Sequence, residues 1–202
     1  MTVIVQESRS LAEQAGAGVG ASLDLGRTAE ELLDAVTGGL ADAGAVDLLD
    51  AVIGPAGPGQ PRQAGGGGTL RLRRLAARWP AGCPAPPGYL DREWAEADPD
   101  RQHRRRLAAG VPVLVPAFEA TTPGEIRAVA SAWADRMLAA RAAGAHSSMI
   151  IPLAARGAVL GMVVLDRLAG SPPFTRADLA LARDIVSRAA VSVDNAVSLS
   201  FA

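Results

Sequence analysis

The sequence contains no lysine, a single cysteine and few aromatic residues: three tryptophans, one tyrosine and three phenylalanines. All twenty basic residues are therefore arginines, which excludes a phosphate-loop lysine and a Schiff-base lysine. The lone cysteine, Cys83, excludes an intramolecular disulfide and is typical of a reducing cytoplasm. With so few aromatic side chains, the core is expected to consist of leucine, valine and isoleucine and of close helix contacts.

A large net charge of either sign is also missing, because the 20 basic and 21 acidic residues give a net charge of −1 at neutral pH. The composition therefore indicates no general affinity for nucleic acid or for an anionic membrane. The N-terminus lacks a basic region followed by an apolar one, so no secretory signal is expected. The longest apolar stretch, residues 149–165, contains Pro152 and Arg156 and is not expected to span a bilayer. We expect a cytoplasmic protein.

Length and composition predict one domain with an additional helix. Apolar residues make up 49% of the chain, which is enough to build a core. Ser10 and Glu13 have the spacing of a capping box, in which two side chains bond each other's backbone amides at a helix start. We divide the chain into an N-terminal helical extension, residues 1–21, and a domain at residues 22–202 that includes a C-terminal helix.

The first half of this domain alternates between helical and extended patterns. A second capping box at residues 28–31 predicts a helix, and residues 46–53 predict a buried strand. Residues 54–68 are rich in glycine and proline and predict a long loop. Residues 69–79 alternate in polarity with one change of phase, which predicts a strand with a β-bulge. Residues 80–98 are expected to be irregular.

A short basic helix is expected at residues 100–109, followed by a strand at residues 111–115. Thr122, Pro123 and Glu125 then form a well-suited helix start, as the cap, the first and the third helical residue. We expect this helix to run to about residue 143. Its apolar face consists of Ile126, Val129, Ala130, Trp133, Met137 and Leu138.

Residues 144–199 are the most informative part of the chain. Two apolar runs flank a short polar turn that contains Gly157, which predicts a β-hairpin. The helix that follows has Thr175 as its cap and Asp178 three residues later. Apolar residues recur along it in alternating steps of three and four, as in a coiled-coil seam. The seam consists of Leu179, Ala182, Val186, Ala189, Val193 and Ala196.

This order of elements resembles the closing hairpin and helix of GAF domains, with Pro152 and Leu153 before the turn and Leu160 and Gly161 after it. Residues 106–116 look like the short helix and third strand of that family, and residues 46–50 look like its first strand. The resemblance covers about residues 22–197. It implies an α+β fold, related to PAS domains, with an antiparallel sheet of five or six strands and helices on both faces. It also implies a small-molecule-sensing and dimerisation module of signalling proteins.

The end of the chain gives the resemblance more detail. Residues 189–196 are similar to GAF domains that precede sporulation-type, metal-dependent serine phosphatase domains in bacterial regulators. The resemblance therefore implies an output domain or partner such as a serine phosphatase. No phosphatase domain is present in these 202 residues, and the degenerate hydrophobic motifs identify no ligand or cofactor.

In a GAF domain a ligand pocket is expected between the sheet and the excursion that crosses it, here residues 80–110, together with the helix from Pro123. Most aromatic residues of the chain lie in or around this region. Their concentration is typical either of an apolar pocket or of anchors that pack a large loop on a sheet. Cyclic nucleotides are not expected, because their GAF motif is rich in asparagine and lysine. The candidate pocket residues are Trp79, Tyr89, Trp94, Phe118, Trp133, Met137 and His146.

The seam of the last helix also has two interpretations. It packs on the sheet of its own domain, or it pairs with its copy in a second chain. Burying one leucine or valine across an interface contributes roughly 1.5 to 3 kcal/mol, so a six-residue seam is sufficient for association. GAF domains commonly dimerise through terminal helices, and we favour a homodimer.

Catalytic residues and a metal site are not expected. Cys83 is a candidate redox sensor, but a lone cysteine in a proline-rich loop is more often inert. Ser147 and His146 are neighbours on a strand and point to opposite faces, which argues against a catalytic pair. The carboxylates near His103 are better explained as a cap on the basic helix than as metal ligands. The arginine run at residues 101–106 lacks the interleaved aromatics that stack on bases, so nucleic-acid binding is not expected.

The leading hypothesis is a non-enzymatic sensor or regulatory domain that binds a small molecule or a partner and transmits a signal through its terminal helices. Two alternatives remain open. One is a redox enzyme of the GAF fold, similar to free methionine sulfoxide reductases and dependent on Cys83, although those enzymes use several cysteines. The other is a structural dimerisation module without a ligand.

Overall fold

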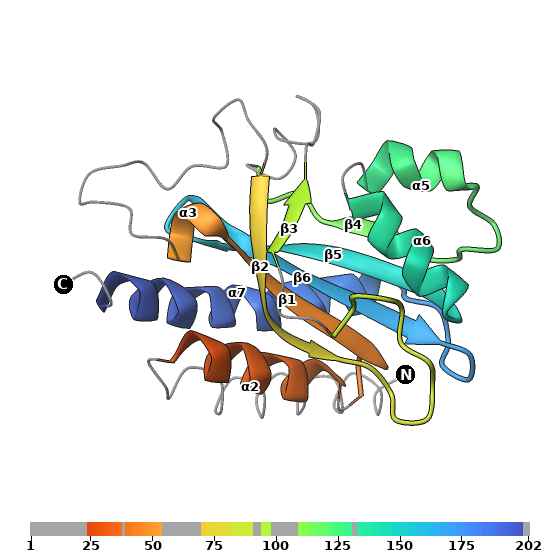
Figure 1. Cartoon of the computed structure of the whole chain (residues 1–202), viewed down its shortest axis with the longest axis horizontal. Coiled ribbons are helices and arrows are strands. Elements are labelled where there is room, and N and C mark those ends of the chain that lie inside the picture. Colours follow the sequence, from red (N-terminus) through yellow and green to blue (C-terminus); the bar gives the residue numbers. More distant parts are fainter. Residues whose placement is uncertain are drawn as a thin grey trace.

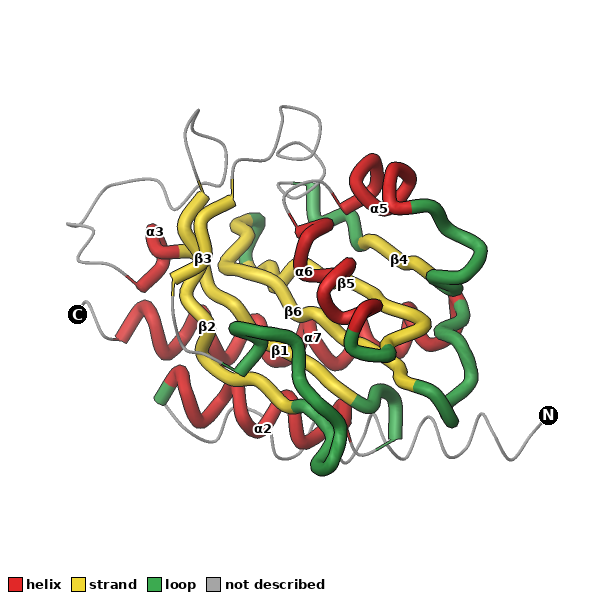
Figure 2. Tube along the Cα trace, turned by 45° about the vertical axis from the view of Figure 1, so that its right-hand side comes forward, coloured by secondary structure: helices red, strands yellow, loops and turns green. Residues whose placement is uncertain are grey.

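The computed structural model describes residues 24–37, 39–53, 70–90, 94–97, 109–130 and 133–199. Six strands form one antiparallel sheet in the order β3-β2-β1-β6-β5-β4. Helices α2 and α7 cover one face, and α5 and α6 lie against the other face beside β4 and β5 (Figure 1, Figure 2). The expected α+β fold, with a six-stranded antiparallel sheet and helices on both faces, is confirmed. The elements are α2 (Leu25–Thr37), β1 (Ala43–Leu49), α3 (Asp50–Ile53), β2 (Leu70–Arg78), β3 (Trp94–Ala97), β4 (Val113–Val115), α5 (Pro123–Ala130), α6 (Ala134–Ala142), β5 (Ala145–Ala155), β6 (Ala158–Leu168) and α7 (Arg176–Leu199).

Three sequence predictions lie outside the described residues: the N-terminal extension at 1–21, the loop at 54–68 and, apart from residue 109, the basic helix at 100–109. Among the described residues, no helix has the length and apolar character needed to cross a membrane.

Helix α2 begins earlier than the capping box at residues 28–31 predicts. Asp24 caps the helix: its Oδ1 accepts the N–H of Arg27 at 2.8 Å, and its carbonyl accepts the N–H of Thr28 at 2.9 Å. Thr28 is fully buried within the first turns. Both Asp24 and Thr28 are good cap residues, and the structure uses the earlier one. The buried face of α2 consists of Thr28, Ala29, Leu32, Leu33 and Val36.

The strand expected at residues 46–53 is placed wrongly, because β1 ends at Leu49 and the next four residues form α3. Val52 is buried in α3, and a short apolar run fits a buried helix as well as a buried strand. The predicted bulge in β2 is confirmed. Val46 of β1 pairs with Ala76 and Asp47 with Arg74, so the register passes over one residue.

Residues 80–98 are not irregular throughout. Strand β3 pairs antiparallel with β2, with Arg73 opposite Trp94 and Leu70 opposite Ala97. Its four residues are too few to display the alternation that identifies a strand in sequence.

The predicted hairpin is confirmed as β5 and β6, each 11 residues long. Arg156 and Gly157 form the connecting turn with φ values of 48° and 79°, the two positive values that a type I′ turn requires. Gly161 follows on β6, where β1 approaches closely. A Cβ atom at Gly161 would lie 2.8 Å from Cα of Leu48 and closer still to the carbonyl oxygen of Asp47. Only glycine fits this position without a shift of β1.

The single helix expected from Pro123 to about residue 143 is wrong, because two helices, α5 and α6, occupy this stretch. The predicted capping box is confirmed: Oε2 of Glu125 accepts the N–H of Thr122 at 2.7 Å, and Oγ1 of Thr122 accepts the N–H of Glu125 at 3.2 Å. Trp133, the N-cap of α6, has φ −93° and ψ −5° in the right-handed region, and its side chain makes no capping hydrogen bond. The apolar spacing continues across this break, so the pattern does not reveal it.

Helix α7 has the predicted cap, since Oδ2 of Asp178 accepts the N–H of Thr175 at 2.7 Å. The proposed dimer seam lies inside the domain. Leu179 is partly buried, and the other five seam residues are at most 1% exposed within a single chain. They pack mainly on β5 and α2. A side chain with no exposed surface cannot also contact a second chain, so the seam's assignment to a dimer interface is corrected. The five are Ala182, Val186, Ala189, Val193 and Ala196.

Candidate functional site

Two carboxylates are completely buried on the sheet face opposite α2 and α7. They belong to Asp47 of β1 and Asp166 of β6. Asp166 pairs with Ala43, and Asp47 lies four residues further along β1, so the two-residue period places both on one face. Gly44 faces the other side, where its missing side chain makes room for Leu33 of α2. Buried carboxylates on a sheet require partners from the chain that covers them.

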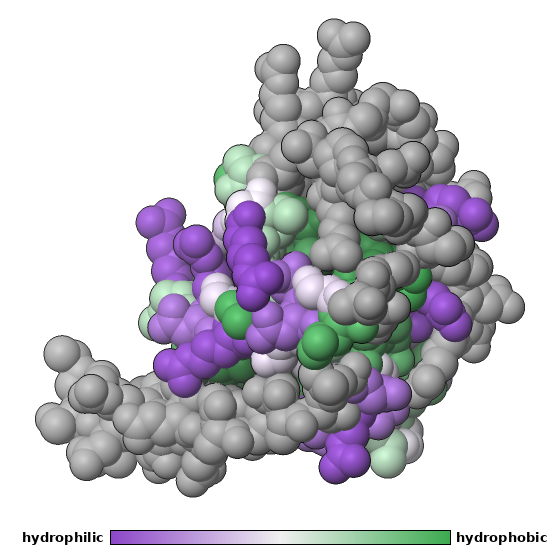
Figure 3. Space-filling model, turned by 90° about the vertical axis from the view of Figure 1, so that its left-hand side faces the viewer, coloured by the Kyte–Doolittle hydropathy of each residue, from purple (hydrophilic) through white to green (hydrophobic). Residues whose placement is uncertain are grey.

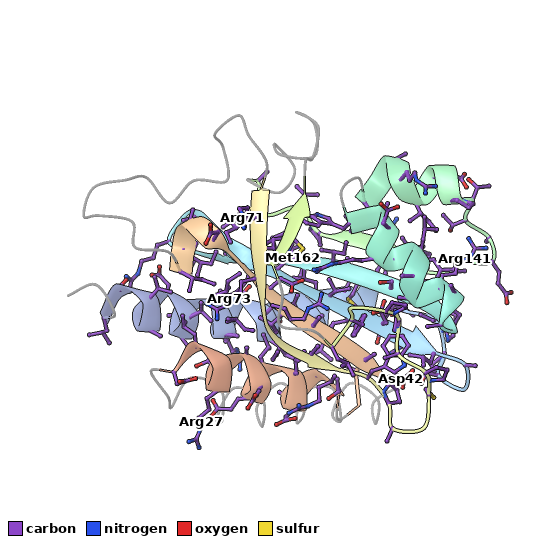
Figure 4. The ribbon with its side chains drawn as sticks, viewed as in Figure 1. Arg27, Asp42, Arg71, Arg73, Arg141 and Met162 are labelled. Carbon is purple, nitrogen blue, oxygen red and sulfur yellow. The ribbon has the colours of Figure 1, made fainter. Side chains whose placement is uncertain are left out.

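Asp47 is held by two arginines from different elements. Nε of Arg74, on β2, donates to its Oδ1 at 2.9 Å, and Nη2 of Arg74 donates to its Oδ2 at 3.2 Å. Nη1 of Arg136, on α6, also donates to Oδ2. The Arg74 side chain is 3% exposed and that of Arg136 is 29% exposed. The ion pair between Arg136 and Asp47 therefore attaches α6 to the middle of the sheet. Met162 of β6 lies opposite Asp47 at this point (Figure 4).

Asp166 is held by the loop that follows β2. The hydroxyl of Tyr89 donates to Oδ2 of Asp166 at 2.9 Å, and the carbonyl of Tyr89 accepts a hydrogen bond from Nη1 of Arg74. The Tyr89 ring meets the ring of Trp79 edge to face at a centroid distance of 4.8 Å. Tyr89 thus joins both carboxylate clusters. We call Asp47, Arg74, Tyr89, Arg136 and Asp166 the polar cluster.

The polar cluster is electrostatically unusual. Burial raises the pKa of the Asp166 carboxyl to about 6, although the hydroxyls of Ser148 and Tyr89 and the charge of Arg74 act in the opposite direction. Burial and the nearby Asp166 raise the pKa of Tyr89 well above its usual value. Within the described part of the chain, Oδ1 of Asp166 and Nε1 of Trp79 are buried without a hydrogen-bond partner. Such atoms mark a place where a polar group can be accepted.

Replacing Asp166 with asparagine is expected to stabilise the protein at neutral pH. The raised pKa means that the folded state holds a proton on Asp166 that the unfolded state has lost, so this group's contribution to stability falls as pH rises from about 4 to above 6. Asparagine stays neutral and can still accept from Tyr89. The stability of Asp166→Asn relative to wild type should therefore rise by about 2 kcal/mol between pH 4 and pH 7. Urea denaturation across this range measures it, and a difference independent of pH would contradict a buried, titrating Asp166.

The sequence-predicted pocket residues fall into several groups. Trp79 and Tyr89 border the polar cluster. Phe118, Trp133 and Met137 belong to the buried core. Trp94 lies on β3, and its side chain is outside the described part of the structure. Nε2 of the remaining candidate, His146, lies 2.9 Å from the carbonyl oxygen of Ser171 in the loop before α7.

Sequence reasoning missed the charged members of the cluster. Asp47 and Asp166 each stand within an apolar strand, beside Leu48 and Leu165 respectively. A carboxylate in a buried strand is a recognisable signal, since such groups are rarely buried without a partner. The arginine partners of Asp47 are 27 and 89 residues from it in sequence and could not be paired with it from sequence alone.

The side chains near the cluster give no catalytic arrangement among the described residues. Oγ of Ser147 donates to the carbonyl of Val115 at 3.1 Å, and Oγ of Ser148 donates to that of Leu165 at 3.3 Å. Neither hydroxyl is bonded to His146. Cys83 is exposed in the loop between Trp79 and Tyr89. The described residues also contain no group of three or more potential metal ligands.

Comparison with known proteins gives a family and several similar structures. The GAF domain model matches residues 28–193. The GAF domain of the cyanobacteriochrome TePixJ is 9% identical with a TM-score of 0.60, covering 88% of this chain and 93% of that chain. The GAF domain of a phosphoenolpyruvate-protein phosphotransferase from Coxiella burnetii is 13% identical with a TM-score of 0.61, covering 96% of each chain. The chromophore-binding domain of the bacteriophytochrome RpBphP3 from R. palustris is 12% identical with a TM-score of 0.63; 97% of this chain and 63% of that chain are covered. No curated protein matches the sequence.

Proposed function

The chain belongs to the GAF domain family, and from this premise we propose that it is a non-enzymatic sensor or regulatory domain. In this proposal a small molecule or a partner binds on the sheet face that carries the polar cluster. Helix α7, on the opposite face, transmits the bound state to an output domain or partner. A serine phosphatase is one such output, suggested by the similarity of residues 189–196 to GAF domains of that type.

The observation that supports the proposal is that the polar cluster includes side chains from two segments that cover this face of the sheet. Tyr89 belongs to the loop after β2, and Arg136 belongs to α6. Tyr89 bonds Asp166 and Arg136 bonds Asp47, so the loop and α6 are both attached to the buried polar cluster. A ligand that bonds to Asp166 or displaces Arg136 would therefore move the loop after β2 or helix α6. Binding and conformational change are thereby connected through few contacts.

Association into a homodimer in the cytoplasm is part of the proposal, with a different contact surface from the buried seam. Val191 and Leu199 are large apolar residues on the outer face of α7, with 50% and 57% of their surface exposed. They are eight residues apart and so lie close to one stripe of the helix. We expect a second copy to contact this stripe. Replacing both residues with serine should shift the protein toward monomer in analytical ultracentrifugation, whereas an unchanged dimer would place the interface elsewhere.

The redox alternative depends on Cys83. Free methionine sulfoxide should show no turnover with the wild-type protein if the sensor proposal holds. Turnover that disappears in Cys83→Ser would establish the enzyme instead. A purely structural module would show neither turnover nor ligand binding.

A thermal-shift screen tests the sensor proposal. Amino acids, carboxylic acids, nucleotides and linear tetrapyrroles are assayed against the wild-type protein. A ligand at one hundred times its Kd stabilises the folded state by about 2.7 kcal/mol, which is readily detected. We expect one class to raise the Tm and the shift to shrink in Asp166→Asn and Arg136→Gln.

The matched control is Arg127→Gln on α5, whose side chain is exposed and lies within 3.5 Å of Asp135 rather than the cluster. This variant should keep the full shift. The absence of any shift, or a shift that both cluster variants retain, would contradict binding at the polar cluster.

A further inference from the structure

Helix α7 is fastened to the β5–β6 hairpin near its first turn by a buried arginine. Nε of Arg167 donates to the carbonyl of Leu40 at 3.0 Å, and its Nη1 donates to the carbonyls of Pro172 and Pro173. Its Nη2 lies 3.3 Å from Oδ1 of Asp178 in the first turn of α7. The Arg167 side chain is 9% exposed. An arginine with this many partners and so little exposed surface anchors the first turn of α7 to β6.

A second arginine fastens the hairpin turn to the other end of α7. Nη1 of Arg156 lies 3.1 Å from Oδ2 of Asp194, and its Nη2 donates to Oδ1 of Asn195 at 2.9 Å. Among the described residues, Arg156 is the one residue other than glycine with a positive φ, 48°. Asparagine, aspartate and glycine fit such a turn position better than arginine does. The contact with α7 offsets the strain of this conformation.

The two fastenings differ in how readily they open. The Arg156 side chain is 67% exposed, whereas that of Asp194 is 9% exposed. The face at which α7 stops shows hydrophilic and hydrophobic described residues next to each other (Figure 3). Water and salt therefore reach the Arg156 contacts and weaken them, and they do not reach the buried anchor.

The hairpin also connects both fastenings to the polar cluster. Asp166 and Arg167 are consecutive residues of β6, so their side chains point to opposite faces of the sheet. Asp166 bonds Tyr89 on the face opposite α2 and α7, and Arg167 bonds Asp178 of α7 on the other face. From there the hairpin extends to its turn at Arg156. A displacement of the polar cluster therefore moves the β5–β6 hairpin, which is attached to α7 at two places.

We propose that Arg156 is a positioning residue, a releasable clasp that fixes the last turns of α7 to the hairpin turn while Arg167 holds the first turn. Opening of the clasp frees the end of α7 from which an output domain would be controlled. The signal that opens the clasp rests on the proposed function. The clasp itself is a property of the protein without ligand, so its test does not depend on finding one.

Hydrogen exchange measured by mass spectrometry tests the clasp in the full chain. Arg156→Asn removes the contacts and introduces a residue that accepts positive φ, so the turn stays folded. We expect amides at residues 190–199 to exchange about tenfold faster, with no change at residues 176–182 or in β1. Arg156→Lys keeps the charge and should restore part of the protection. Arg183→Asn, an exposed arginine on α7, is the matched control and should leave exchange unchanged.

Salt provides a readout that a purely structural turn residue would not give. Raising sodium chloride should accelerate exchange at residues 190–199 in the wild-type protein and not in Arg156→Asn. Equal exchange in Arg156→Asn and wild type would overturn the proposal. Uniform acceleration in every segment would overturn it too, because that result indicates loss of overall stability. A failed ligand screen with a positive clasp result would refute the sensor proposal alone.

Discussion

Gly161→Ala is expected to destabilise the protein by about 3 kcal/mol or more, near the upper end of the range for overpacked cores. The added Cβ would lie 2.8 Å from Cα of Leu48 and closer to the carbonyl of Asp47. Both are backbone atoms of β1, so no side chain can rotate away and the strand itself must move. For a domain of this size the loss corresponds to a Tm lower by roughly 6 to 12 °C. Differential scanning calorimetry measures the change.

Gly124→Ala is the matched control. Gly124 lies in the first turn of α5, has no positive φ, and its nearest neighbour to an added Cβ is Oγ1 of Thr122 at 3.9 Å. Alanine there should be neutral or stabilising by about 0.4 to 1 kcal/mol. If Gly161→Ala lost no more stability than Gly124→Ala, the close approach of β1 and β6 would be wrong.

Arg74→Met is expected to cost about 3 to 5 kcal/mol, because it leaves the fully buried Asp47 with Arg136 as its remaining arginine. It also removes the donor to the carbonyl of Tyr89. Arg73→Met, the adjacent exposed arginine of β2, should change stability by at most about 1 kcal/mol. Urea denaturation compares the two.

The double variant Asp47→Leu with Arg74→Met distinguishes the net contribution of the ion pair to stability from the loss of stability when Asp47 is left without Arg74. Replacing both members of a buried pair with apolar residues of similar volume is often neutral, so the double variant should recover most of the stability lost in Arg74→Met. Losses that simply add would show that the two residues do not interact in the folded protein.

Local patterns in the sequence were sufficient for the fold wherever geometry depends on adjacent residues. The hairpin was predicted from Gly157 and the apolar runs around it, and the capping boxes of α5 and α7 from pairs three residues apart. The start of α2 was misplaced because Asp24 and Thr28 are both good caps. The break before α6 was invisible because the apolar spacing continues through Trp133.

The candidate site was less accessible to sequence reasoning, because its contacts join residues far apart in the chain. The aromatic ring of Tyr89 is what makes it a candidate pocket residue in the sequence, whereas its hydroxyl is the group that bonds Asp166. A charged residue within an apolar strand indicates a buried carboxylate with a partner. A search for clustered aromatic residues does not detect that pattern. The apolar seam of α7 fits either packing on its own sheet or pairing with a second chain, and only the position of the sheet decides between them.

Coupling between the two faces of the sheet is the central claim, and Tyr89→Phe tests it most directly. This change removes the hydroxyl bonded to Asp166 and leaves the ring in place. Hydrogen exchange should become faster in the loop at residues 79–90 and also in the first turns of α7, with α2 unchanged, because Arg167, which follows Asp166 on β6, bonds Asp178 there. Faster exchange confined to the loop would contradict the claim, because the cluster would then act on one face alone.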